Sequence, residues 1–309
     1  MLSLIIIFSS ITNNLFFLCL LKYILLIAAL ITIIYIKINC HYYNKNSYYK
    51  VDKIRHNYLK KIFYYYAQEL PNYNHTYIHY RKIFWCWLQG VENAPKLYRA
   101  CLDSLRKNIK NYEIIIITKE NIKKYVKFPP YILEKYKNNQ ISNTHFSDLL
   151  RLELLIKYSG TWIDASVLLT KYDEVFFNGS LFFFQAFNNK NIAGSNWFIT
   201  SEKNNPILKS TRDLLYEYYR TNNNLYNYFL FHFFFKFSCE KYFNDYQNIP
   251  KYSNDPVHIL QSKLLKKFSK KEYKLILNMA SLHKLKNIKP QNDEKDLYYH
   301  YILDYYLMN

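Results

Sequence analysis

Two carboxylates and one guanidinium in a largely apolar stretch are the first candidates for chemistry. Asp148, Arg151 and Asp164 lie in HFSDLLRLELLIKYSGTWIDAS, residues 145–166. Ionised carboxylates accept hydrogen bonds or bind cations, and a guanidinium donates a fork of hydrogen bonds to oxygen anions. Three charges beside so many apolar residues therefore need either mutual pairing or a ligand.

The apolar spacing predicts the element that carries the first two charges. Leu149, Leu152 and Ile156 recur at spacings of three and four, which predicts a helix, and Thr144 is a candidate for its N-cap. Residues three positions apart share one helix face, so the aspartate and the arginine are predicted to project together near the helix start.

A turn after this helix positions the third charge. The Ser-Gly pair at 159–160 ends the helix, and an extended run follows with Asp164 at its end. In an α/β sheet, ligands usually bind at such strand ends. A purely structural explanation is also open, because an Asp–Arg pair three apart is often a surface ion pair worth ~0.5 kcal/mol or less. The combination with Trp162 and the glycine stop favours a site.

Four segments carry a family resemblance. SDLLRLELLIKYSGTWIDAS resembles the signature of the capsular polysaccharide synthesis proteins, relatives of glycosyltransferase family 32, which have a GT-A fold. IFWCWLQGVENAP at 83–95 resembles that family's nucleotide-binding strand and loop, NWFITSEKNNPIL at 196–208 its central block, and SLHKL at 281–285 its C-terminal motif. The resemblance implies a transferase that takes a sugar from a nucleotide sugar and gives it to a polysaccharide or lipid-linked glycan.

The resemblance also implies roles for single residues. Asp148 and Arg151 would hydrogen-bond the donor sugar, and Asp164 would address the ribose or a metal-bound water. Trp85 and Gln89 would lie near the nucleotide base.

In the C-terminal motif, His283 would reach the diphosphate either as a metal ligand together with Asp164 or as a hydrogen-bond donor, with Lys284 as an alternative counter-charge. Many GT-A enzymes hold Mn²⁺ or Mg²⁺ with Asp-x-Asp, whereas this chain reads Asp164-Ala165-Ser166. Hard cations prefer charged oxygen ligands, so the hydroxyl of Ser166 puts direct metal binding by this motif in doubt. The capsular branch often has a hydroxyl residue there, so this departure does not weaken the resemblance.

Composition limits the classes of partner. The net charge is +19, from 42 basic and 23 acidic residues, which suits anionic lipid, nucleic acid or a diphosphate substrate. The basic residues are scattered and form no known nucleic-acid motif, so nucleic acid is not predicted as a partner. A solvated basic surface explains the charge equally well. The 34 tyrosines and four glycines indicate a coding bias, so aromatic content is not evidence for carbohydrate binding.

An N-terminal anchor is predicted at residues 1–37. Residues 15–36 are apolar except for Thr32 and Lys22, which is close to the ~20 residues needed to span a bilayer. A cleaved signal peptide is the alternative, but no Lys or Arg precedes this stretch and no cleavage pattern follows it. Basic residues accumulate after it, so the positive-inside rule predicts a single-pass membrane protein with its C-terminal bulk in the cytoplasm. Five cysteines without metal-ligand spacing suit a reducing compartment.

Residues 38–80 are predicted to form a basic, amphipathic juxtamembrane segment. Its helical stripe contains six apolar or aromatic positions, namely Val51, Ile54, Tyr58, Ile62, Tyr66 and Leu70. Lys60 and Lys61 lie elsewhere around this helix and suit anionic head groups. Packing of the helix on the main domain is an equally good interpretation.

Residues 81–309 are predicted to form one α/β domain with a GT-A-like, mainly parallel mixed sheet between helices. Strands are expected at 82–88 and 113–118, and helices at 96–107, 122–126 and 131–136. The aromatic stretch 214–237 is predicted to be helical and either core or membrane-facing.

The sequence is compatible with three functions. The favoured one is a membrane-anchored glycosyltransferase. The second is an inactive relative that acts as a scaffold in polysaccharide assembly, which the missing second aspartate allows. The third is a basic peripheral protein that binds anionic lipid or nucleic acid, which only the charge supports.

Overall fold

A central sheet organises the structure, a computed structural model that describes residues 57–187, 189, 191–290 and 296–307. The strands are β1 (Lys82–Cys86), β2 (Glu113–Ile117), β3 (Gly160–Ile163), β4 (Val167–Leu169), β5 (Leu181–Gln185), β6 (Gly194–Ser201) and β7 (Leu282–Lys284). Five strands form the first sheet in the order β2-β1-β3-β6-β5, and β4 pairs with β7 in a second. β1 is parallel to β2 and β3, whereas β6 is antiparallel to β3 and β5. The predicted mixed α/β fold is confirmed.

Helices cover both faces of this sheet. They are η1 (Lys60–Tyr64), α2 (Tyr65–Glu69), η2 (Val91–Asn93), α3 (Lys96–Asn108), α4 (Ile122–Tyr125), α5 (Pro130–Lys137), α6 (Asn143–Tyr158), α7 (Glu174–Phe177), α8 (Pro206–Thr221), α9 (Leu230–Lys241), α10 (Phe243–Gln247), η3 (Pro256–His258), α11 (Ile259–Lys263), α12 (Lys270–Met279) and α13 (Tyr298–Leu307). The elements expected at 82–88, 96–107, 113–118, 122–126 and 131–136 all end within two residues of their predicted bounds.

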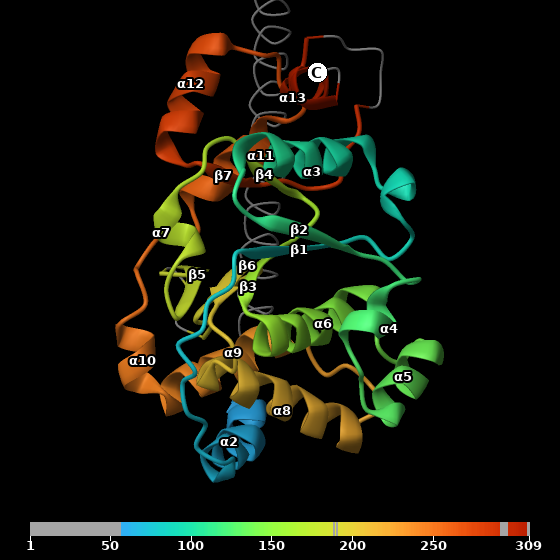
Figure 1. Cartoon of the computed structure of the whole chain (residues 1–309), viewed down its shortest axis with the longest axis vertical. Helices are drawn as coiled ribbons and strands as arrows, with labels where there is room; N and C mark the ends of the chain where they lie inside the picture. Colours follow the sequence, from blue (N-terminus) through green and yellow to red (C-terminus); the bar gives the residue numbers. More distant parts are fainter. Residues whose placement is uncertain (1–56, 188, 190, 291–295, 308–309) are drawn as a thin grey trace, which may run out of the picture. The chain divides into compact units, whose positions relative to one another are not determined.

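The alternation of strand side chains divides the interior into two layers. Phe84 and Trp162 pack with α6, α8 and α9 on one face of the sheet. Their neighbours Ile83 and Ile163 point to the other face, where α3 and α7 lie (Figure 1). A third apolar cluster joins the outer side of α3 to α11, α12 and α13, which places β7 beside β4. The sheet edge that carries the charged residues is therefore fixed from both faces.

The helix that carries the first two charges begins and ends at identifiable residues. The hydroxyl of Ser142 caps α6 by accepting a hydrogen bond from the His145 amide at 3.3 Å, so the predicted cap at Thr144 was wrong by two positions. Ser159 ends the helix with φ 61°, and Gly160 follows with φ 100°. A Cβ atom at Gly160 would lie 2.4 Å from the Lys82 carbonyl oxygen, so only glycine fits this close approach to β1.

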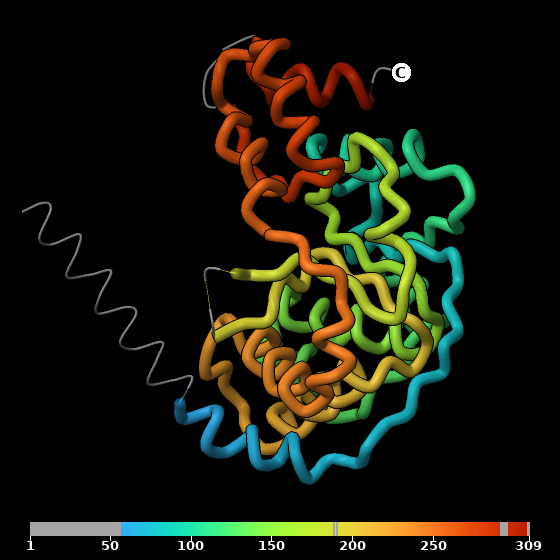
Figure 2. The backbone as a smooth tube through the Cα atoms, turned by 90° about the vertical axis from the view of Figure 1, so that its left-hand side faces the viewer, coloured from blue at the N-terminus to red at the C-terminus, as the bar shows by residue number. Residues whose placement is uncertain are grey.

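The described part of the predicted juxtamembrane helix packs on the main domain. Leu59, Phe63 and Ala67 form its buried face, and the Phe63 ring lies 4.9 Å from that of Phe234 in α9. The predicted stripe of Tyr58, Ile62 and Tyr66 lies on the exposed side of this helix, and a different set of residues packs on the domain. Residues 70–81 then run without helix or strand along the outside of the domain to β1, coloured blue to cyan in Figure 2.

Two other predictions concern helices. The stretch 214–237 is not one helix, because α8 ends at Thr221 and α9 begins at Leu230. α9 buries Phe231, Phe234 and Phe235 completely or almost so, which makes it core.

The predicted anchor at residues 1–37 lies outside the described residues. Among residues 57–307 that are described, no helix is both long and apolar enough to cross a membrane.

Candidate functional site

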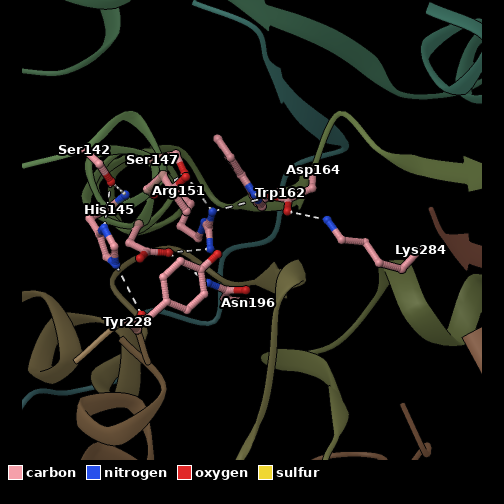
Figure 3. A network of polar contacts seen from close by, with 11 residues as sticks. Ser142, His145, Ser147, Arg151, Trp162, Asp164, Asn196, Tyr228 and Lys284 are labelled. Carbon is pink, nitrogen blue, oxygen red and sulfur yellow. Dashed lines mark hydrogen bonds and ion pairs between the residues drawn. The ribbon is translucent and has the colours of Figure 1, made fainter. Parts of the chain in front are cut away.

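A pocket of about 540 Å³ opens where the parallel strands β1 and β3 end. Its size is typical of a small-molecule site, and its location is where α/β sheets usually bind ligands. Nineteen residues line it: Cys86, Trp87, Leu88, Gln89, Tyr98, Asn143, Thr144, Ser147, Asp148, Arg151, Trp162, Asp164, Ala165, Ser166, Asn196, Trp197, Tyr228, His232 and Lys284. Figure 3 shows the polar network on its wall.

Asp148 and Arg151 form a buried ion pair on α6. Arg151 Nη1 donates to Asp148 Oδ1 at 2.7 Å. Asp148 is 4% exposed and Arg151 is 2% exposed. Asn196 Nδ2 of β6 donates to the same oxygen at 2.8 Å, so neither bond engages Asp148 Oδ2. Burial raises the pKa of Asp148, while Arg151 opposes the rise. This pair is not the solvated surface pair that its spacing alone allowed.

The Arg151 guanidinium is held between two aromatic rings. Its Cζ atom lies 5.1 Å from the Trp162 ring and 5.7 Å from the Phe231 ring. Nη2 donates to Ser147 Oγ at 3.0 Å and approaches Asp164 Oδ1 at 3.5 Å, as Figure 3 shows. Cation–π contacts and ion pairs together immobilise the planar group and point its Nη2 edge toward the strand end.

Asp164 lies at the centre of the network, one residue after β3. Its amide still donates to the Trp197 carbonyl of β6 at 2.9 Å, which fixes the backbone. Oδ1 accepts from Trp162 Nε1 at 2.8 Å, and Oδ2 accepts from Lys284 Nζ at 2.7 Å. Burial opposes ionisation, but Lys284 and Arg151 together lower the pKa of Asp164, so it is ionised at neutral pH.

Lys284 reaches the pocket from the small second sheet. The β4–β7 pairing places it opposite Val167, and the Leu285 amide donates to the Ser166 carbonyl at 2.8 Å. Its Nζ also donates to Ser166 Oγ at 2.7 Å. One ammonium therefore bridges the two oxygen-bearing side chains of the Asp164-Ala165-Ser166 motif.

The structure brings most of the predicted site residues together, but not all. Asp148, Arg151, Asp164, Ser166, Lys284 and Gln89 all line the pocket. Trp85 does not, because it is fully buried on the α3 side of β1, and Trp87 lines the pocket two residues later.

His283 is also absent from the pocket wall. Strand alternation that turns Lys284 into the pocket turns its neighbour away, and His283 is fully buried opposite Leu168. Its role as a metal ligand has no support from this position. Among the residues that the structure describes, no group of three or more His, Cys, Asp or Glu side chains is arranged to hold a metal ion.

Several lining residues were not predicted from the sequence. Asn196 opens the segment that resembles the family's central block, so its place there was a usable signal. Tyr228 and His232 flank the start of α9, in a segment whose aromatic residues concealed them. Burial and the charge of Arg151 lower the pKa of His232 to about 4, so its ring is neutral at pH 7. Burial raises the pKa of the Cys86 thiol to about 12, which argues against a thiolate nucleophile.

The fold and the pocket define an α/β protein with a charged ligand site at the ends of parallel strands. The family described as capsular polysaccharide synthesis protein matches residues 33–302, most of the chain. The protein therefore belongs to this family, and the resemblance carried by the four segments is confirmed. No curated protein matches the sequence significantly.

Similar solved structures include two glycosyltransferases. The PaToxG glycosyltransferase shares 18% identity over 65% of this chain and 83% of its own, with a TM-score of 0.40. The apo form of GlyE from Streptococcus pneumoniae TIGR4 shares 10% identity over 75% of this chain, with a TM-score of 0.43. This chain spans 61% of the GlyE chain. Both TM-scores are below 0.5, so the family assignment rests on the family match alone.

Proposed function

We propose that this protein is a glycosyltransferase that moves a sugar from a nucleotide sugar to a polysaccharide or lipid-linked glycan. The proposal rests on membership of the capsular polysaccharide synthesis family and on one observation. Two ion pairs, Arg151–Asp148 and Lys284–Asp164, lie side by side in one pocket at the ends of parallel strands. They supply both the anionic and the cationic groups that this chemistry needs.

The first group that the reaction needs is an acceptor for the hydroxyl groups of the donor sugar. Asp148 offers a carboxylate oxygen, Oδ2, that Arg151 and Asn196 leave unengaged. Because Arg151 and Asn196 fix the carboxylate through Oδ1, a sugar hydroxyl would meet an oriented acceptor. Positioning of this kind contributes to the rate by holding the anomeric carbon in place.

The second need is a surface for the nucleotide. Trp87 and Gln89 follow β1, and the Trp87 ring packs edge to face on Tyr98 at 5.5 Å. Aromatic faces suit the apolar surface of a base, so we place the nucleoside at this end of the pocket. The diphosphate would then lie toward Arg151, whose charge stabilises the leaving group as the glycosidic bond breaks.

The test is transfer and binding with a panel of nucleotide sugars, measured by calorimetry and by release of the nucleoside diphosphate. Asp148→Asn is nearly isosteric and should lower turnover at least tenfold, or ~1.4 kcal/mol in transition-state terms. Asp103→Asn is the matched control, because that carboxylate pairs with Arg106 on α3 outside the pocket. Unchanged turnover in a folded Asp148→Asn protein would remove the buried pair from the site.

A scaffold without turnover is the second candidate. It is favoured by one observation, that Asp164 and Ser166 already bind Lys284. Tight binding of a glycan fragment together with absence of transfer for every donor in the panel would support it over the enzyme.

We also propose that the domain contacts an anionic membrane through the outer face of η1 and α2. This face exposes Tyr58, Ile62 and Tyr65 by 51%, 45% and 69%, with Lys60 and Lys61 beside them. Aromatic and basic side chains together suit lipid head groups, and each lysine near such a surface is worth ~1 kcal/mol.

Vesicle sedimentation tests this contact. A protein lacking residues 1–56 should sediment with phosphatidylglycerol vesicles and not with phosphatidylcholine vesicles. Lys60→Glu with Lys61→Glu should abolish the binding, whereas Lys270→Glu with Lys271→Glu on exposed α12 should not. Equal binding of both double variants would contradict this surface and leave only the general positive charge.

A further inference from the structure

We propose that the ammonium group of Lys284 takes the place of a divalent cation in this pocket and binds the donor diphosphate directly. The inference rests on the proposed function, since it names the group that meets the leaving phosphate. It is carried by the Lys284 contacts to Asp164 and Ser166, which come from the two positions of an Asp-x-Asp motif.

The residues present do not fit a protein-bound divalent metal. Both side chains that would coordinate it, Asp164 and Ser166, bind Lys284 Nζ at 2.7 Å. The other oxygen of Asp164 accepts from Trp162 and lies 3.5 Å from Arg151 Nη2. A divalent cation at Asp164 would therefore have to displace the Lys284 ammonium and would lie against the Arg151 guanidinium. The motif supplies one carboxylate, and a cation bound through it and the substrate phosphates would first have to displace Lys284 from Asp164.

The remaining carboxylate of the pocket does not supply the missing ligand. Asp148 pairs with Arg151 at 2.7 Å, and the same oxygen accepts from Asn196. His283, the sequence candidate for a metal ligand, is fully buried away from the pocket wall. A divalent ion that used the other Asp148 oxygen would lie beside the Arg151 guanidinium, so within the described ranges Asp164 and a hydroxyl are its main ligands.

The position of the Lys284 side chain is fixed by the fold. β4 and β7 fix its backbone opposite Val167, and its side chain is only 19% exposed. An ammonium has three N–H donors, and two of them point to Asp164 and Ser166. The third is left for a phosphate oxygen. The charge is thus oriented before the donor arrives, which lowers the cost of stabilising new negative charge.

The chemistry balances with this group in place. The bond between the anomeric carbon and the diphosphate oxygen breaks, and its electron pair stays on the nucleoside diphosphate. A bond from the anomeric carbon to the acceptor oxygen forms, and the hydroxyl proton is released to solvent. The positive charge of Lys284 offsets the charge on the departing phosphate.

The first test is calorimetric binding of uridine, guanosine and thymidine diphosphate to the full-length protein, in EDTA and in Mn²⁺. The bound nucleotide should show a Kd that differs by less than about threefold between the two buffers. Lys284→Met should weaken binding at least ~10-fold, or ~1.4 kcal/mol. Lys286→Met, an exposed lysine two residues later, should bind like the natural protein.

A gain-of-function variant keeps the test decisive if Lys284→Met does not fold. Ser166→Asp combined with Lys284→Ala creates an Asp-x-Asp pair without the ammonium. This double variant should bind the nucleotide only when Mn²⁺ is present, and misfolding cannot produce such a gain.

The failures are distinguishable. Binding by the natural protein only in Mn²⁺, or unweakened binding by Lys284→Met in EDTA, would overturn the inference and leave the proposed function in place. Absence of binding for every nucleoside diphosphate in both buffers would overturn the proposed function, and the inference with it.

Discussion

The Lys284 ammonium lies 2.7 Å from Asp164 Oδ2, although the two residues are 120 positions apart in the sequence. The contact joins the end of β3 in the central sheet to β7 in the small sheet. The pocket wall is therefore completed by a segment near the C-terminal end of the given sequence, and the geometry of the Asp164 carboxylate depends on the β4–β7 pairing.

The buried Arg151–Asp148 pair predicts a large cost when only one partner is removed. Arg151→Met leaves a desolvated carboxylate without its cation, and the free energy of unfolding should fall by ~3–5 kcal/mol. Asp148→Asn in the same chain should recover part of the loss, because an amide carries no charge. Urea unfolding of the two single variants and the double variant measures this coupling.

The control for that cycle is an exposed pair of the same spacing. Arg106 and Asp103 are 52% and 34% exposed at the side chain, so Arg106→Met should cost ~0.5 kcal/mol or less. Strictly additive losses for Arg151→Met and Asp148→Asn would show that the buried pair does not act as a unit.

Gly160 is predicted to be irreplaceable for steric reasons. Gly160→Ala would put a Cβ atom 2.4 Å from the Lys82 carbonyl oxygen at φ 100°, so β1 and β3 must separate, at a cost of at least ~3 kcal/mol. Gly179→Ala is the matched control, since φ is 107° there and no atom lies within 4 Å. It should cost only ~1–2 kcal/mol. Thermal unfolding compares the two, and equal losses would mean that the close approach to β1 is not the cause.

Local signals in the sequence were sufficient for the elements that hold the first two charges. The apolar spacing of α6, its Ser-Gly end and the β-branched run of β2 each depend on neighbours within a few positions, and all were predicted. The parallel pairing of β1 with β2 followed from the order of strand, helix and strand.

Contacts between segments far apart in the sequence could not be predicted from local residue patterns. Which residue of the pair His283 and Lys284 faces the pocket is set by the register with β4, and a shift of one residue would exchange them. Trp85 and Trp87 both pack against the apolar layer on the α3 side, but only Trp87, one residue beyond the end of β1, reaches the pocket. The buried face of the η1–α2 helix could not be predicted either. Two stripes, one with Leu59 and one with Ile62, fit a helical period equally well, and only contacts with the domain decide which is buried.

Acid is predicted to destabilise the fold through a buried histidine. Burial lowers the pKa of His283 to about 4, against an unfolded value of ~6.5. Between these values the unfolded chain binds a proton that the folded chain does not, so stability is lost as pH falls from ~6.5 toward 4 and is unaffected above that range.

The measurement is the change in unfolding free energy between pH 7 and pH 4.5. His283→Leu should lose about 1–2 kcal/mol less than the natural protein over this interval. Lys271→Gln, an exposed lysine on α12 that does not titrate there, should show the same pH dependence as the natural protein. A steeper loss in His283→Leu would contradict the buried neutral histidine.

The distribution of basic residues leads us to propose that residues 57–309 face the cytoplasm. Lys37, Lys45, Lys50 and Lys53 follow the apolar stretch 15–36, whereas no Lys or Arg precedes Lys22. Basic residues are retained on the cytoplasmic side, so protease added to intact cells should leave the domain uncut, and protease added to inverted vesicles should cleave it. Detergent-permeabilised cells provide the control for intrinsic sensitivity. Cleavage from outside intact cells would reverse the orientation and separate the pocket from cytosolic nucleotide sugars.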